Sequence, residues 1–300
     1  MGRFEAVVFF AFLGLVVADN AAQSGQSRIV SGWVAREGQF PYMMYLRTVS
    51  VHGQITACGG SIIHHNWGFS SARCTANRVN LMIRAGMVNI NRPRVYFETS
   101  TVFTAPEFID EIHPITQPHD IALIRFNRWL NYDNFVQPIR IMRSADMNRN
   151  YAGVRMTTSG WGTTWTGGQV TNDLNWVHLT GVTNFMCMLV FNNNFFIRES
   201  TICAGPYNVT SQGICSGDSG VPLTVVDVDG QLTQVGVGSI VSQFGCHAGL
   251  PGAFVRPGHY HPWIRAVTGI NFDWTPSVVV SEDKTETKEP SLNILNLLRK

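Results

Sequence analysis

Short apolar or alternating runs, separated by Gly, Pro, Asn and Asp, follow one another from about residue 33 to residue 258. Runs of this length predict β-strands, and many short strands at such spacing predict an all-β sandwich or barrel. A hydrophobic fraction of 45% in 300 residues is ample for a core. Only residues 259–268 indicate a helix, which would close the fold. The clearest strand candidates are residues 40–46, 60–63, 68–72, 81–85, 121–126, 157–160, 223–228 and 235–242.

The first 18 residues have the pattern of a secretory signal peptide. Arg3 precedes an apolar run over residues 6–17, and Val16 and Ala18 suit a small-residue cleavage site. The alternative is a buried N-terminal helix. The run is shorter than the roughly 20 apolar residues that span a bilayer, and no later stretch approaches that length. We therefore expect a secreted, extracellular protein without a membrane span, in which residues 19–28 form a short pro-segment.

Export would place the six cysteines in an oxidising compartment, where three disulfides are expected. Their spacing includes no CxxC, so we expect neither a zinc site nor another cofactor. A net charge of +2, with 14% charged residues, gives no basic field for nucleic acid. Asn208-Val-Thr210 is an acceptor sequon, and export would allow glycosylation of Asn208.

The composition changes after residue 270. Residues 281–290 are a run of Glu, Asp, Lys and Thr without an apolar anchor, and such a run cannot offset its ordering entropy. Residues 291–300 end in a short amphipathic patch that would be marginal as an isolated helix. We predict a disordered tail over residues 271–300; docking of the patch to a partner is the alternative.

One serine lies in a stretch suited to chemistry, Gly213-Ile-Cys-Ser-Gly-Asp-Ser-Gly-Val-Pro-Leu223. Small neighbours let the backbone around Ser219 turn tightly and bring N–H groups to a bound oxygen, which is how an oxyanion hole is built. Near the other end of the chain, Arg28-Ile29 places a basic residue before Ile-Val. This pair of residues resembles the activation site of protease zymogens, where cleavage would free an amine at Ile29. The amine would pair with Asp218, because a buried carboxylate is tolerable only when it has a partner.

Several motifs occur together in one order along the chain. They are Arg28-Ile-Val-Ser-Gly32, Cys58-Gly-Gly-Ser-Ile62, Ala72-Arg-Cys74, Asp120-Ile-Ala-Leu123, Ser159-Gly-Trp-Gly162 and Gly217-Asp-Ser-Gly-Val-Pro-Leu223. Over residues 29–270 the chain thereby resembles the chymotrypsin-like (trypsin-family) serine proteases, and Gly249-Leu-Pro-Gly-Ala-Phe254 resembles their insect digestive type. The resemblance implies two six-stranded antiparallel barrels with a cleft between them. It also implies the disulfides Cys58–Cys74, Cys187–Cys203 and Cys215–Cys246.

The resemblance assigns Ser219 as nucleophile and Asp120 as the buried carboxylate of a Ser-His-Asp triad. The position of the base, directly before Cys74, holds Arg73. A guanidinium has five donors, no acceptor and a pKa above 12, so Arg73 cannot take a proton from Ser219. Loss of the base costs such an enzyme a factor of about 10⁶ in turnover. A bidentate clamp of Arg73 on Asp120 is one expectation, and a solvated Arg73 the other.

No histidine replaces the missing base in this interpretation. His64 and His65 precede the strand that leads to Arg73, in a turn far from the cleft, and His119 should face away from Asp120 because neighbouring side chains of an extended segment alternate. The other histidines, including His113, match no catalytic position.

The resemblance also places an oxyanion hole and a substrate pocket. The hole would use the N–H groups of Gly217 and Ser219, whereas Val221 replaces a usual glycine close behind this loop. The segment from Ser242 to Cys246 is about one residue shorter than usual, which indicates a narrowed or rebuilt cleft. The predicted pocket residues, none of them acidic, are Gly213, Ile214, Ser242, Gln243 and Gly252.

These residues favour a secreted, non-proteolytic homologue that binds a protein or peptide ligand in the cleft between the barrels after an activating trypsin-like protease cleaves behind Arg28. The alternative is a weakly active endopeptidase or esterase of chymotrypsin or elastase type that uses Ser219. A third possibility is that Arg73 is a variant within an otherwise active enzyme.

Overall fold

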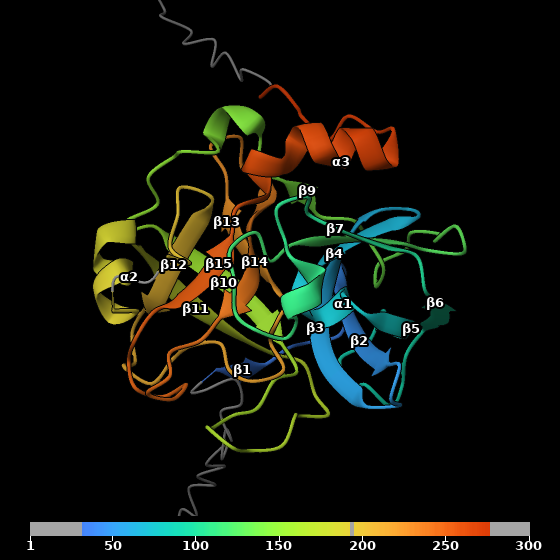
Figure 1. The fold of residues 1–300 in the computed structure, drawn as a ribbon, viewed down its shortest axis with the longest axis horizontal. Helices are drawn as coiled ribbons and strands as arrows, with labels where there is room; N and C mark the ends of the chain where they lie inside the picture. The colour runs from blue at the N-terminus through green and yellow to red at the C-terminus, as the bar shows by residue number, and fades with distance from the viewer. Residues whose placement is uncertain (1–31, 193–194, 277–300) are drawn as a thin grey trace, which may run out of the picture.

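The computed structural model describes residues 32–192 and 195–276. Predictions on the signal peptide, the pro-segment, Arg28, Ile29 and residues 277–300 lie outside these ranges. Within them, two β-sheets stand side by side with a helix at one end (Figure 1). No helix in this part of the chain is long and apolar enough to cross a membrane.

The first sheet contains seven strands and comes from the N-terminal half of the chain. It curls so that β6 (Val95–Thr99) and β7 (Val102–Thr104) form its two edges, and only two residues separate these strands in sequence. One bent segment therefore pairs with β5 through its first half and with β8 through its second. In spatial order the strands are β6 (Val95–Thr99), β5 (Arg78–Ala85), β2 (Met43–Ser50), β3 (Ile55–His64), β4 (Trp67–Ser70), β8 (Ala122–Arg125) and β7 (Val102–Thr104).

The second sheet closes into a barrel because β12 (Thr201–Pro206) pairs with both β15 (Gly252–Val255) and β11 (Asn175–Val182). The order around the barrel is β11 (Asn175–Val182), β10 (Arg155–Gly160), β13 (Pro222–Val226), β14 (Leu232–Ile240), β15 (Gly252–Val255) and β12 (Thr201–Pro206). Two short strands add to it: β1 (Trp33–Val34) pairs with β11, and β9 (Arg140–Ile141) runs parallel to β14. The all-β prediction of a chymotrypsin-like fold is confirmed, with one closed barrel and one curled sheet.

A continuous apolar cluster joins the two sheets. Phe69 and Leu123 from the first sheet pack in the same cluster as Leu223 and Phe254 from the second, and all four are fully buried. Separate packing within the first sheet surrounds Leu46 and Ile83. The shared core fixes the sheets relative to each other, so side chains at their junction have defined positions.

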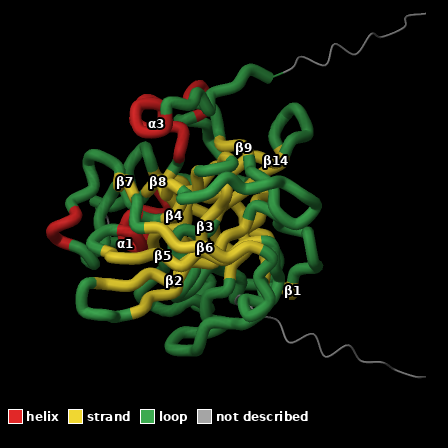
Figure 2. The backbone as a smooth tube through the Cα atoms, turned by 90° about the vertical axis from the view of Figure 1, so that its right-hand side faces the viewer, coloured by secondary structure: helices red, strands yellow, loops and turns green. Residues whose placement is uncertain are grey.

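Short helices connect and cover the strands. These are α1 (Ala72–Thr75), α2 (Asn184–Val190) and α3 (His261–Thr268), with the 3-10 turns η1 (Asp110–Ile112), η2 (Ser144–Asp146) and η3 (Pro257–Tyr260). The closing helix α3 matches the prediction for residues 259–268, and it buries Ile264 and ends at Gly269 in the left-handed conformation. Figure 2 shows α3 beyond one end of the sheets.

The ordered domain continues past the predicted boundary at residue 270. The indole nitrogen of Trp274 donates a hydrogen bond to the Ile141 carbonyl at 2.9 Å, and the Arg140 guanidinium lies 3.4 Å from the centre of the Trp274 ring. Asp273 accepts a hydrogen bond from the Ser144 N–H at 3.1 Å. These contacts fasten Asp273 and Trp274 to η2 and β9, beyond the predicted boundary.

Three disulfides tie the structure together: Cys58–Cys74, Cys187–Cys203 and Cys215–Cys246. They are the pairs that the resemblance implied. The first joins β3 to α1, and the third fastens the segment before Ser219 to the turn after β14.

Candidate active site

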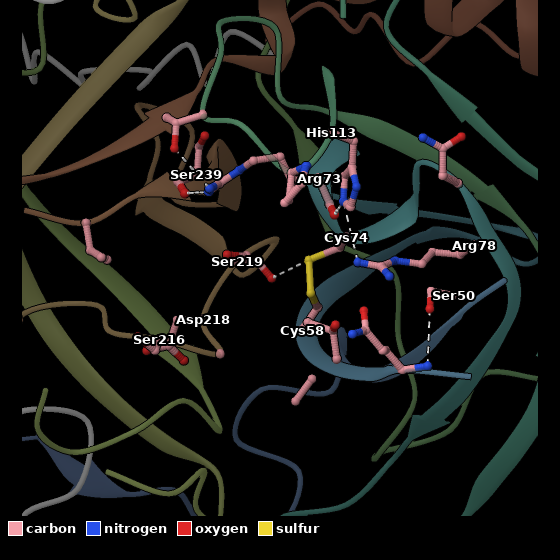
Figure 3. Close-up of a pocket in the computed structure, with 18 of the residues that line it drawn as sticks. Ser50, Cys58, Arg73, Cys74, Arg78, His113, Ser216, Asp218, Ser219 and Ser239 are labelled. Carbon is pink, nitrogen blue, oxygen red and sulfur yellow. Dashed lines mark hydrogen bonds between the residues drawn. A yellow bond between two sulfur atoms is a disulfide. The ribbon is translucent and has the colours of Figure 1, made fainter. Parts of the chain in front are cut away.

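A cleft of about 910 Å³ lies where the two sheets meet, and both sheets line it (Figure 3). The first sheet contributes Arg73, on α1, and the Cys58–Cys74 disulfide. The second contributes residues 214–219 and Ser239, near the end of β14. The folded chain therefore brings Arg73 and Ser219, which are far apart in sequence, into one cleft.

The predicted nucleophile Ser219 sits in a tight turn before β13. Gly217 and Gly220 flank it with φ values of +93° and +87°, a region that L side chains rarely adopt. A Cβ atom at Gly220 would also meet the Gly59 carbonyl oxygen at 2.3 Å. The turn is anchored by hydrogen bonds from the Gly59 N–H to the Ser219 carbonyl at 2.8 Å and from the Gly220 N–H to the Gly238 carbonyl at 2.7 Å. Ser219 is therefore held by backbone contacts and remains half-buried.

The polar groups of this turn keep open positions. Among the described residues, the N–H groups of Gly217 and Ser219 donate no hydrogen bond, and the Ser219 hydroxyl has no partner. Two free N–H groups beside a serine are the donors that an oxyanion hole requires.

Asp218, next to Ser219, points into the protein and is 1% exposed. Its carboxylate accepts hydrogen bonds from the Gly162 and Cys215 N–H groups, each at 2.9 Å. Burial raises the pKa of this carboxyl to about 6, although both backbone donors act in the opposite direction. Within residues 32–192 and 195–276, no cation pairs with Asp218.

Arg73 lies on Asp120 instead of extending into solvent. The backbone N–H of Arg73 donates to Asp120 Oδ1 at 2.7 Å, and its Nε donates to Oδ2 at 2.9 Å. The Arg73 side chain is 20% exposed, and that of Asp120 is fully buried. The expected clamp is present, but it is not a guanidinium fork on both oxygens. The two terminal nitrogens bind elsewhere: Nη1 to the Thr116 hydroxyl at 3.3 Å and Nη2 to the Ser239 carbonyl.

Ser239 completes this network. Its hydroxyl donates to Asp120 Oδ2 at 2.7 Å, so one serine binds the carboxylate through its side chain and the guanidinium through its carbonyl. The network thereby links α1 of the first sheet to β14 of the second. Sequence reasoning missed Ser239, because Ser242 stands three residues later and offered the same residue type for the cleft strand.

The predicted pocket is only partly at the cleft. Ile214 lines it, and residues 239–241 of β14 and its extension do so as well, whereas Ser242 and Gln243 lie just beyond this segment. The Ser242 hydroxyl accepts a hydrogen bond from the Phe244 N–H at 3.2 Å, which places Ser242 in the turn toward Cys246. Gly213 and Gly252 do not line the cleft, and a Cβ at Gly252 would meet the Ile214 side chain at 2.9 Å. Ile214 therefore occupies the space in front of Gly252.

Val221 lies behind the nucleophile loop, as expected, and does not line the cleft. Its side chain is fully buried and points at three glycines. A Cβ atom would approach a Val221 methyl group at 2.4 Å from Gly59, 3.0 Å from Gly160 and 3.1 Å from Gly238. The absence of side chains at these three positions makes room for the branched residue.

Four histidines that could have replaced the base have other hydrogen-bond partners. His119 Nδ1 lies 2.9 Å from the Tyr260 hydroxyl, so it faces away from Asp120 as predicted. His113 Nε2 lies 2.6 Å from the Arg73 carbonyl oxygen. His64 and His65 bond to Asn66 and the Leu130 carbonyl, respectively, and do not line the cleft.

Two further predictions concern sites outside the cleft. Asn208 follows β12 and is exposed. In the part of the chain that the structure describes, no three His, Cys, Asp or Glu side chains form a group that could hold a metal ion.

Known proteins resemble the chain over most of its length. Residues 29–264 match the family model named Trypsin. Collagenase from Hypoderma lineatum is 30% identical over 249 residues, which cover 82% of this chain and 90% of the relative. Chymotrypsin-like elastase family member 1 from Rattus norvegicus is 28% identical, with coverage of 86% and 97%. The solved structure of HL collagenase matches with a TM-score of 0.71 at 28% identity, over 81% of this chain and 99% of the other.

Proposed function

Because this chain belongs to the trypsin family of chymotrypsin-like serine proteases, we propose that it is a secreted member without proteolytic activity that binds a protein or peptide in its cleft. In this proposal Asp120 and Ser219 are the remnants of a triad, and Arg73 stands where the histidine would be. Such a protein would act as a decoy for protease inhibitors or substrates, or as a cofactor in an extracellular cascade.

The contacts of Arg73 are the observation that carries this proposal. Each guanidinium nitrogen donates to an oxygen: Nε to Asp120, Nη1 to Thr116 and Nη2 to Ser239. An arginine has no acceptor, so it cannot remove the proton from the Ser219 hydroxyl. It also occupies the carboxylate that would orient a histidine, and no other base among the described residues bonds to Ser219. A serine hydroxyl without a base is a weak nucleophile.

The other part of the proposal is that cleavage after Arg28 sets the conformation of the Ser219 turn. Cleavage after Arg28 by a trypsin-like protease would free the amine of Ile29, which would pair with the buried carboxylate of Asp218. The two backbone donors on Asp218 and its burial support this role, because a buried charge without a counter-ion destabilises a fold. Such pairing would order the Ser219 turn for ligand binding. The insect digestive type indicated by residues 249–254, glycosylation of Asn208 and export remain predictions.

A weakly active endopeptidase or esterase is the second candidate. The relatives carry the names collagenase and elastase, and the Ser219 turn keeps two free N–H groups. Water or the substrate would then have to serve as base. The apolar side chain of Ile214 in front of Gly252 would favour a small or apolar substrate residue.

Digestion of a protein mixture separates the two candidates. The chain cleaved after Arg28 is incubated with denatured proteins, and new N-termini are identified by mass spectrometry, with Ser219→Ala as the matched control. We expect the same set of N-termini from both proteins. New termini that depend on Ser219 would overturn the non-proteolytic proposal and establish the second candidate.

A further inference from the structure

One arginine in the cleft has no acceptor for its hydrogen bonds. Arg78 begins β5, opposite Ser50 of β2, and its side chain lines the cleft. The Nε atom of Arg78 is buried and makes no hydrogen bond. The one polar contact of its guanidinium in the described part of the chain is between Nη2 and His113 Nε2, at 3.4 Å.

The contact with His113 does not satisfy Arg78. His113 Nε2 lies 2.6 Å from the Arg73 carbonyl oxygen, and a carbonyl oxygen can only accept, so this geometry assigns a proton to Nε2. A protonated ring nitrogen has no lone pair left for Arg78. Two donors therefore face each other, and the guanidinium lacks an acceptor.

The charges around the cleft leave Arg78 without a counter-ion. Of the residues that the structure describes, Arg73, Arg78, His52 and His113 line it, and Asp218 is the one carboxylate that does so, buried beneath two backbone donors. Asp120 is paired with Arg73. Asp110, whose carbonyl oxygen accepts a hydrogen bond from Asn77 at 2.8 Å, forms no ion pair with Arg78 within the described ranges. Burial lowers the pKa of the Arg78 guanidinium, which is the sign of a charge held without compensation.

We propose that Arg78, beside His113, is an anion subsite that takes the carboxylate of an Asp or Glu side chain in a bound peptide. This subsite lies across the Cys58–Cys74 disulfide from Ser219 (Figure 3). A planar carboxylate suits the guanidinium fork, and it would supply the acceptor that Arg78 lacks. The inference rests on the proposed binding of a peptide in the cleft and specifies the chemistry of that peptide.

Two peptide pools test the subsite. Each consists of fluorescein-labelled octapeptides with uncharged residues at all positions except one, which holds Glu in one pool and Gln in the other. Fluorescence anisotropy gives the apparent Kd of each pool for the protein carrying Ser219→Ala and cleaved after Arg28, so that the Ser219 turn is ordered and hydrolysis cannot interfere. Charged hydrogen bonds of this kind are worth enough to give about a tenfold preference for the Glu pool.

Three variants assign the preference to Arg78. Arg78→Gln should abolish it, and Arg78→Lys should retain part of it, because an ammonium keeps the charge but not the fork. Arg128→Gln removes the same charge from an exposed position outside the cleft lining and should leave the preference unchanged. In the protein with native Arg78, added salt should weaken the preference.

The outcomes are distinct. A Glu preference that survives Arg78→Gln, that disappears equally in Arg128→Gln or that ignores salt would overturn the subsite. Equal binding of both pools would overturn the subsite while leaving peptide binding in the cleft intact. If neither pool binds, both the subsite and the proposed binding function are wrong.

Discussion

Arg73 and Asp120 should stabilise the fold as a pair, and a double-mutant cycle measures this. Removing one partner of a buried ion pair usually costs 3–5 kcal/mol. Here Arg73→Met leaves Asp120 with two donors, the Arg73 N–H and the Ser239 hydroxyl, and the lost side chain was 20% exposed. We therefore expect a loss of about 2–3 kcal/mol in the free energy of unfolding, at or below the lower end of that range. Asp120→Asn should cost a similar amount, and the double variant much less than the sum, which gives a coupling energy of about 2 kcal/mol.

Urea unfolding at neutral pH, followed by tryptophan fluorescence and circular dichroism with the disulfides intact, provides the free energies. Arg143→Met is the matched control, because Arg143 pairs with Asp146 near the surface, and we expect it to cost less than about 1 kcal/mol. A coupling energy below about 0.5 kcal/mol between Arg73 and Asp120 would refute the argument that the arginine serves the buried carboxylate.

Three further predictions concern cleavage after Arg28, the buried carboxyl of Asp218 and the contacts of Trp274. Trypsin should cleave the secreted protein after Arg28, and N-terminal sequencing should then begin at Ile29; a stable product that begins only at the signal junction would count against the zymogen-like design. Before that cleavage, the free energy of unfolding should fall by about 2 kcal/mol between pH 4 and pH 6 because of Asp218, since its folded pKa of about 6 lies above the ordinary 3.8 and the folded state holds the proton longer. Asp218→Asn should remove this slope, and an unchanged slope in that variant would exclude Asp218 as its source. Truncation after Pro276 should lower Tm by at most about two degrees. Truncation after Phe272 should lower it by several degrees, because it removes the Trp274 and Asp273 contacts. Equal Tm values for the two truncated proteins would contradict this role of Trp274.

The strand pattern could be predicted because each strand has its own apolar signal. Residues 81–85 and 157–160 lie inside β5 and β10, and the run 259–268 contains α3. The curling of the first sheet could not be predicted. It arises because β6 and β7 are two halves of one bent segment, and its two halves pair with different strands, β5 and β8. Long-range pairing of this kind leaves no trace in a local pattern.

The parts of the site in which a motif fixes the backbone could be predicted, whereas the directions of individual side chains could not. The turn at Ser219 and the contact of Arg73 with Asp120 lie as the motifs indicated. Ser239 was missed because residue type alone does not separate two serines three positions apart. Val221 was expected close behind the Ser219 turn, and it lies there, but the three glycines that make room for it are not neighbours in the linear sequence.

Labelling of Ser219 by a serine-directed phosphonate tests the central claim most directly, because attack on phosphorus requires a base for the proton and donors for the developing charge. The protein cleaved after Arg28 should neither label nor hydrolyse peptide esters above the background set by Ser219→Ala. Arg73→His should gain labelling, since Asp120 and the Ser239 hydroxyl are in place to orient an imidazole. Labelling and turnover at Ser219 in the unmodified protein would contradict the proposal that Arg73 has removed its proteolytic activity.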